Sequence, residues 1–212
     1  MNLKDYYWYF DSVLPHKFCD ELIKYGNTKK EELGLIGEIS EKNASGKSLE
    51  DRDFQDLKKK RDSNVVWLSD RWIYREIHPY VHEANKNSQW NFEWDFSEAC
   101  QFTKYKLNQY YDWHCDSWEK PYANDNGNIN YRNKIRKLSV TCQLSDSSEY
   151  EGGELEFQYR NKDNPNMVAP CEQAKKKGSI IVFPSFVWHR VKPVTKGTRY
   201  SLVIWNLGKP FR

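Results

Sequence analysis

The residues with the clearest chemical potential are a histidine and a carboxylate separated by one residue, His114 and Asp116. Alternate residues of a β-strand share a face, so these two side chains can present an imidazole and a carboxylate to one metal ion. The pattern alone carries little weight, because 5 histidines and 30 acidic residues among 212 give 5 × 30/212, or about 0.7, such triplets by chance.

The C-terminal segment gives this pair more significance, because it contains His189 followed by Arg199 and Ser201. If His189 and Arg199 flank a hairpin whose tip lies near Val194, they lie opposite each other and face the same way. Ser201 then shares that face. The sequence therefore predicts a metal-binding histidine beside a fixed cation and a hydroxyl.

Two histidines and one carboxylate form the facial triad of non-haem Fe(II) oxygenases, which leaves coordination positions open. An arginine beside such a site can bind a carboxylate through two parallel hydrogen bonds. The combination favours Fe(II) with a chelating keto acid. Zinc binds the same residue types, so the spacing leaves zinc open as an alternative.

The elements that must position these residues begin with two predicted helices. The first covers about 16–29, and the second starts at Ser69 or Asp70 and places Ile73 and Ile77 on one side. A short strand is expected at 65–68 and a packed edge strand at 6–10. Residues 34–64 are charged and poor in large apolar groups, so we expect a long irregular excursion there.

Short segments of alternating apolar and polar residues fill the chain from residue 91 onward, starting with Phe92, Trp94 and Phe96. The strands expected after them are 100–106, 111–116, 137–144, 154–159, 179–183, 187–191 and 198–206. Many short strands with a period of two predict a β-barrel or a β-sandwich. The long polar segment 117–134, which includes Trp118, follows the His114–Asp116 pair and is a candidate lid.

Composition narrows the functional classes. The net charge is only +3, which argues against a dedicated nucleic-acid binder. No apolar run is long enough for a membrane span, and the N-terminal residues do not form a signal peptide. The 5 cysteines are odd in number and widely spaced, as expected for free thiols in a reducing compartment. We therefore expect a soluble, cytoplasmic protein without a membrane partner.

The sequence resembles the iron(II)- and 2-oxoglutarate-dependent dioxygenases, and specifically their prolyl 4-hydroxylase-like branch. The resemblance rests on the order and spacing of several short stretches, namely 13–15, 19–20, 101–105, 111–116, 138–141, 150–155 and 183–201. It implies a mainly β fold, a double-stranded β-helix or jelly-roll barrel, supported by N-terminal helices. In that case residues 1–212 form one domain, with helical support and the excursion in 1–90 and the jelly-roll core in 91–212.

The resemblance also implies roles for individual residues. His114, Asp116 and His189 correspond to the iron ligands, and Arg199 to the residue that binds the distal carboxylate of 2-oxoglutarate. Tyr105 corresponds to a tyrosine that hydrogen-bonds this cosubstrate, and Ser201 is an additional contact. The family often has glycines between the tyrosine and the first histidine. This chain has none there, and Asn108 is the residue expected to adopt the left-handed conformation in their place.

The implied reaction is the hydroxylation of a C–H bond with release of succinate and CO2, most naturally on a prolyl residue of a peptide or protein. Its cofactors are Fe(II), 2-oxoglutarate and O2, with ascorbate as a possible addition. A free amino acid or another small molecule is the alternative substrate. Nucleic acid is disfavoured, because the related repair enzymes carry a second arginine where this chain has Trp205. Two other classes stay open: a non-catalytic metal-binding jelly-roll module, and a zinc or manganese isomerase or hydrolase.

Overall fold

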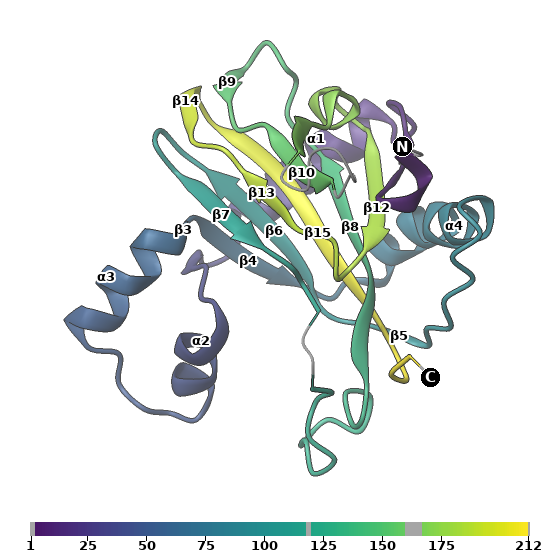
Figure 1. Cartoon of the computed structure of the whole chain (residues 1–212). Helices are drawn as coiled ribbons and strands as arrows, with labels where there is room; N and C mark the ends of the chain where they lie inside the picture. The colour runs from purple at the N-terminus through teal and green to yellow at the C-terminus, as the bar shows by residue number, and fades with distance from the viewer. Residues whose placement is uncertain (1–2, 118–119, 160–166, 212) are drawn as a thin grey trace.

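The computed structural model describes residues 3–117, 120–159 and 167–211, and its N-terminal part alternates short strands with helices (Figure 1). The elements before residue 90 are η1 (Leu3–Asp5), β1 (Trp8–Phe10), α1 (His16–Asn27), β2 (Glu32–Leu33), α2 (Gly37–Ala44), α3 (Asp51–Lys60), β3 (Arg61–Asp62), β4 (Asn64–Leu68) and α4 (Arg71–Asn87). The two long predicted helices, the strand at 65–68 and the edge strand near residue 8 are thereby confirmed.

The remainder of the described chain is almost entirely β-structure. Its elements are β5 (Phe96–Ser97), β6 (Cys100–Tyr105), β7 (Tyr110–His114), β8 (Ile135–Gln143), β9 (Tyr150–Gly152), β10 (Leu155–Tyr159), β11 (Met167–Pro170), η2 (Glu172–Lys175), β12 (Ile180–Pro184), β13 (His189–Val191), β14 (Val194–Gly197) and β15 (Arg199–Gly208). Among the described residues, no helix is long and apolar enough to cross a membrane.

Two antiparallel sheets provide the framework. The larger has the order β1-β12-β8-β15-β6-β4-β2, with β5 paired to β15, and the smaller has the order β11-β10-β13-β7-β3. A third pair, β14 and β9, forms a separate two-stranded sheet. Neighbouring strands come from distant parts of the chain, as in a jelly-roll barrel, so the predicted fold class is confirmed. The first 90 residues also supply strands to both sheets, because β1, β2 and β4 join the larger and β3 joins the smaller.

Helices α1 and α4 cover the outer face of the larger sheet. Leu22 of α1 and Ile77 of α4 are fully buried against strand residues such as Val140 and Leu202. Packing is close: a Cβ atom at Gly26 in α1 would lie 2.6 Å from the Phe102 ring. The helix therefore approaches the sheet closely only because residue 26 has no side chain. A second apolar cluster lies on the other side of this sheet and includes members of the smaller one, β10 and β13.

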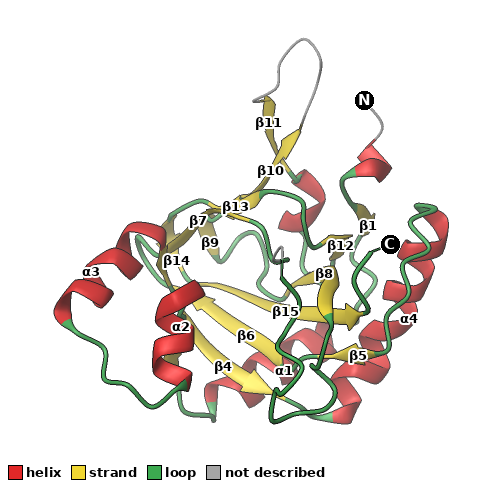
Figure 2. Cartoon of the chain, turned by 60° about the horizontal axis from the view of Figure 1, so that its bottom comes forward, coloured by secondary structure: helices red, strands yellow, loops and turns green. Residues whose placement is uncertain are grey.

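The prediction of an irregular excursion at 34–64 is wrong, because this segment contains α2 and α3. Leu57 is the buried anchor of α3, and the carboxylate of Asp53 accepts a hydrogen bond from the backbone N–H of Glu50 at the helix start. Helix α3 consists mostly of charged residues and has only Leu57 buried, so the low apolar content of this segment concealed the helix. Both views show α2 and α3 together beside β3 and β4, at the other end of the sheet from α4 (Figures 1 and 2).

The predicted hairpin between His189 and Arg199 is also wrong. His189 lies in β13 of the smaller sheet, whereas Arg199 lies in β15 of the larger sheet, where it pairs with Tyr105. The residues between them form β14, which pairs with β9 instead. The two side chains therefore belong to facing layers of the barrel and do not lie opposite each other on adjacent strands.

The alternating segment Phe92, Trp94 and Phe96 is not a continuous strand, because only Phe96–Ser97 pairs with β15. The side-chain amide of Asn85 donates to the backbone C=O of Phe92 and accepts from its N–H, both at 2.9 Å. These two backbone groups are therefore not available for pairing with a neighbouring strand. Trp94 stacks on His82 of α4, with ring centroids 4.6 Å apart. The alternation therefore reflects packing against a helix.

Candidate active site

The structure brings His114, Asp116 and His189 together as a group that could hold a metal ion, with their ligand atoms all within 4.8 Å of one another. His114 ends β7 and His189 begins β13, and the two residues are paired across these strands. Asp116 lies just beyond the end of β7, where its backbone N–H donates to the carbonyl of Ser185. The carboxylate oxygens of Asp116 lie 3.8 Å from His114 Nε2 and 3.7 Å from His189 Nε2.

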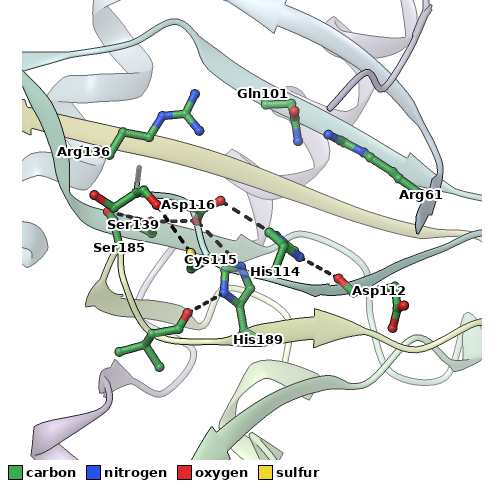
Figure 3. Close-up of polar contacts among 12 residues, drawn as sticks. Arg61, Gln101, Asp112, His114, Cys115, Asp116, Arg136, Ser139, Ser185 and His189 are labelled. Carbon is green, nitrogen blue, oxygen red and sulfur yellow. Dashed lines mark hydrogen bonds and ion pairs between the residues drawn. The ribbon is translucent and has the colours of Figure 1, made fainter. Parts of the chain in front are cut away.

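Hydrogen bonds fix the orientation of all three side chains (Figure 3). The Nδ1 atoms of His114 and His189 lie 2.7 Å from the carbonyl of Asp112 and 3.0 Å from that of Val187. Because a carbonyl can only accept, each Nδ1 carries the proton and each Nε2 keeps its lone pair for a metal. Ser139 donates to Asp116 Oδ2 at 2.7 Å and thereby holds the carboxylate.

The electrostatics of the group suit a divalent cation. Burial and, to a smaller extent, the neighbouring His189 together lower the pKa of His114 from 6.5 to about 3, so this imidazole is neutral. Burial alone would raise the pKa of Asp116, but its interactions with His189, His114 and Arg136 and the hydrogen bond from Ser139 outweigh this effect and leave that pKa below its ordinary value. A neutral histidine beside an ionised carboxylate is the protonation state that metal ligation requires.

Arg199 lies inside the barrel, with only 2% of its surface exposed. Its guanidinium carbon is 5.8 Å from the ring centroid of Tyr105, its strand neighbour on β6. Its Nη1 atom is buried without a hydrogen-bond partner in the part of the chain that the structure describes. Ser201 follows on the same strand, is 2% exposed and pairs with Thr103 and Gln143. The pocket thus offers an unsatisfied guanidinium, a phenol and a hydroxyl to an anionic ligand.

The turn that places Tyr105 has the predicted conformation, since Asn108 has a φ angle of 65°. The other singled-out histidines serve elsewhere. His78 hydrogen-bonds Ser97 at 3.0 Å, and His82 stacks on Trp94. The candidate lid is tied to the barrel by Tyr122, which donates to Glu98 at 3.0 Å, and Trp118 lies outside the described residues.

Two arginines near the metal-binding group were not singled out from the sequence. Arg136 forms a double hydrogen bond with Glu98, at 2.7 and 2.6 Å, and its guanidinium carbon lies 3.8 Å from the Trp205 ring centroid. Arg61 is buried on β3 beside Tyr111. Figure 3 shows the side chains of Arg61, Gln101 and Arg136 on the same side of the metal-binding group.

Comparisons with known proteins agree with this geometry. Residues 100–206 match the 2OG-Fe(II) oxygenase superfamily. A PKHD-type hydroxylase of Synechococcus sp. (strain CC9605) is 37% identical over 95 residues, which are 45% of this chain and 35% of that relative. The match to this curated relative therefore spans only about a third of its length.

Solved structures share the fold over nearly the whole chain. A viral collagen prolyl hydroxylase from Paramecium Bursaria Chlorella virus-1, in complex with 2OG, has a TM-score of 0.62 at 20% identity and covers 96% of both chains. A prolyl hydroxylase from Trichoplax adhaerens, in complex with a peptide fragment of hypoxia inducible factor, has a TM-score of 0.59 at 18% identity and covers 95% of this chain and 83% of the other. The family match covers half of the chain, and it agrees with the barrel fold and with the two histidines and one carboxylate of the site. This protein therefore belongs to the 2OG-Fe(II) oxygenase superfamily.

Proposed function

We propose that this protein is an Fe(II)- and 2-oxoglutarate-dependent dioxygenase that hydroxylates a C–H bond of a prolyl residue in a peptide or protein. His114, Asp116 and His189 are the iron ligands, and Arg199, Tyr105 and Ser201 bind 2-oxoglutarate. The observation that carries the proposal is the buried, unpartnered guanidinium of Arg199 in the same barrel as a two-histidine, one-carboxylate group.

The residues present fit the two groups they would hold. The Nε2 lone pairs and one carboxylate match the ligand preference of non-haem Fe(II), and the orphaned Nη1 of Arg199 needs an anionic acceptor. When bound, Fe(II) with 2-oxoglutarate and O2 supplies the oxidant for C–H hydroxylation, and the cosubstrate leaves as succinate and CO2. In a zinc hydrolase, Arg199 would instead bind an anionic substrate, and the reaction would not depend on O2.

The protein's own contribution is orientation. Ser139 and the two backbone carbonyls hold the ligand side chains in one arrangement, so little rearrangement accompanies metal binding. Arg199 is held rigidly by burial and fixes one end of the cosubstrate. The exposed ring of Trp67, whose centroid lies 6.2 Å from that of Trp205, is an apolar surface that a proline ring could contact.

The prolyl assignment is supported by the structural relatives, because two of them are prolyl hydroxylases and one of these is in complex with a peptide. A free amino acid is the second candidate, and it is developed below from Arg61. The free state of all five cysteines supports a location in a reducing compartment such as the cytoplasm.

An anaerobic titration tests the cofactor chemistry. Adding Fe(II) and 2-oxoglutarate to the metal-free protein should produce the weak visible charge-transfer band of a chelated keto acid. His189→Ala should lose the band, and Arg199→Ala should need more 2-oxoglutarate to reach it. His16→Ala, a change at an exposed histidine outside the site, is the matched control and should behave like the wild type.

The second step tests turnover. Under air, proline-containing peptides should gain one oxygen atom in mass while succinate forms in equal amount. A folded wild-type protein that gives no charge-transfer band would overturn the dioxygenase assignment and favour the metal-binding module or the isomerase. A normal band without oxidation of any prolyl compound would overturn only the prolyl assignment.

A further inference from the structure

Arg61 is a buried cation that has no acidic partner among the described residues. The residue is 4% exposed; its Nε donates to Ser63 Oγ at 2.8 Å and its Nη1 to the carbonyl of Leu35 at 3.3 Å. Its Nη2 is buried and has no hydrogen-bond partner in the described part of the chain. Within the described residues, the arginines that form ion pairs are Arg52, Arg136 and Arg190. A buried charge without a counter-charge is costly, so it points to an absent ligand.

The guanidinium of Arg61 lies close to the proposed iron ligands. Its central carbon is 4.5 Å from the centroid of the Tyr111 ring, and that ring stacks on His114 at a centroid distance of 3.5 Å. Figure 3 shows the ends of the Arg61 and Gln101 side chains pointing toward each other on the same side of the metal-binding group as Arg136. The contact with the Tyr111 ring offsets only part of the cost of burying the cation.

Several parts of the chain hold Arg61 in this position. It is the first residue of β3 and pairs with Tyr111 of β7, and its N–H donates to Leu57 at the end of α3. Gly34 leaves the necessary space, because a Cβ atom there would lie 2.6 Å from Nε of Arg61. Arg61 therefore follows directly after α3 and is held rigidly by its neighbours. A binding site requires such a fixed side chain.

Arg61, Arg136 and Arg199 differ in how their charge is compensated. Arg136 is neutralised by Glu98. Arg199 is unpaired, and the proposed function assigns it one carboxylate of 2-oxoglutarate, whose other end chelates the metal. The cosubstrate therefore has no group left for Arg61, whose remaining partner must come from the substrate.

We propose that Arg61 forms a second anion-binding subsite, and that the substrate presents a free carboxylate to it. This inference rests on the proposed function and narrows it: the oxidised residue is a free amino acid or the C-terminal residue of a peptide. A neutral peptide carbonyl would satisfy one N–H group but leave the charge uncompensated. A carboxylate provides both the counter-charge and the acceptor for Nη2.

The test compares ligands that differ only at this group. Acetyl-Ala-Pro with a free C-terminal carboxylate and its C-terminal amide are titrated calorimetrically into the protein with Fe(II) and 2-oxoglutarate, without O2. The acid should bind at least about 10-fold more tightly than the amide. Arg61→Gln should abolish this preference, while Arg52→Gln, which changes an exposed arginine of α3, should retain it.

A panel of other N-acetyl amino acids and their amides separates the two proposals. An acid other than proline that binds with an Arg61-dependent preference and is hydroxylated, while the prolyl acid is not, supports the subsite and overturns the prolyl assignment. A prolyl amide that binds and is hydroxylated as well as the acid supports the prolyl assignment and overturns the subsite. If no acid in the panel binds more tightly than its amide to the wild type, the subsite is refuted without any variant.

Folding of Arg61→Gln is checked by circular dichroism. Should that variant be unfolded, Arg61→Lys replaces it: lysine keeps the charge but loses the planar fork, so the acid preference should fall without disappearing. An acid preference that is unchanged in a folded Arg61→Gln variant would assign the carboxylate to another residue and overturn the inference.

Discussion

Replacing Ser139 by alanine should weaken metal binding although the serine is not a ligand. Its hydroxyl donates to Asp116 Oδ2 at 2.7 Å and lies 2.9 Å from the hydroxyl of Ser185. It is completely buried, so water cannot take its place without rearrangement. The variant leaves the Asp116 carboxylate without this donor and free to rotate away from the Nε2 atoms.

The size of the effect follows from the role of such supporting groups. Loss of a partner that orients a metal ligand typically weakens metal affinity 10- to 100-fold, which corresponds to about 1.4–2.8 kcal/mol. Stability should also fall by about 1–3 kcal/mol, because a buried acceptor loses its hydrogen bond. Stability and metal affinity therefore have to be measured separately, and the control variant should lose stability without losing metal affinity.

Ser179→Ala provides that control. Ser179 is equally buried, and its hydroxyl accepts a hydrogen bond from the backbone of Ser12 at 3.0 Å, but the residue is not part of the metal-binding group. Both variants should be less stable in urea, and only Ser139→Ala should bind Fe(II) more weakly in an anaerobic competition with a chromogenic chelator. Equal iron affinities for the two variants would refute the argument that Ser139 positions Asp116.

Three further predictions concern stability. Glu98→Gln should cost about 3–5 kcal/mol in urea unfolding, because the buried Arg136 loses its counter-charge. A loss of unfolding free energy well below this range would show that solvent screens the Arg136–Glu98 pair and would contradict the argument. Replacing glycine by alanine inside a helix usually adds about 1 kcal/mol of stability, but Gly26→Ala should destabilise the protein because the new Cβ clashes with the Phe102 ring. Adding Phe102→Leu to this variant should relieve the clash. The metal-free protein should lose stability as the pH falls from 6.5 toward 3, since the His114 imidazole is protonated only in the unfolded chain over that range. If the stability of the metal-free His114→Gln variant falls with pH as steeply as that of the wild type, this explanation is wrong.

The candidate metal-binding group could be predicted from the sequence because several short stretches together resemble a known family in their order and spacing, whereas the His114–Asp116 pattern alone occurs readily by chance. The way in which the fold brings these residues together could not be predicted. Asp116 lies beyond the end of β7, so a shared strand face does not explain its position; its backbone bond to Ser185 does. Arg199 reaches the site from the other sheet, and the hairpin that was expected to carry it does not exist.

The two arginines that complete the surroundings of the site illustrate a more general limit. Arg61 and Arg136 are two of 33 basic residues, and nothing in their neighbouring sequence indicates burial. Their positions depend on long-range pairings, β3 with β7 and β8 with β15, which periodicity does not reveal. The helices at 37–60 were missed for a related reason, since their main role is to lead the chain into β3 and not to fill the core.

Charge balance connects these residues to the substrate. With Asp116 as the anionic ligand, a divalent metal ion keeps one unit of positive charge, and Arg199 and Arg61 each add another. The dianionic cosubstrate compensates two of these three units, and Arg136 is already neutral with Glu98. One positive charge then remains in a barrel where water is largely excluded, and Arg61 is the group that holds it. A substrate that places one carboxylate beside Arg61 closes this balance and a substrate without a carboxylate does not, so this group should govern the affinity more strongly than the ring of the substrate.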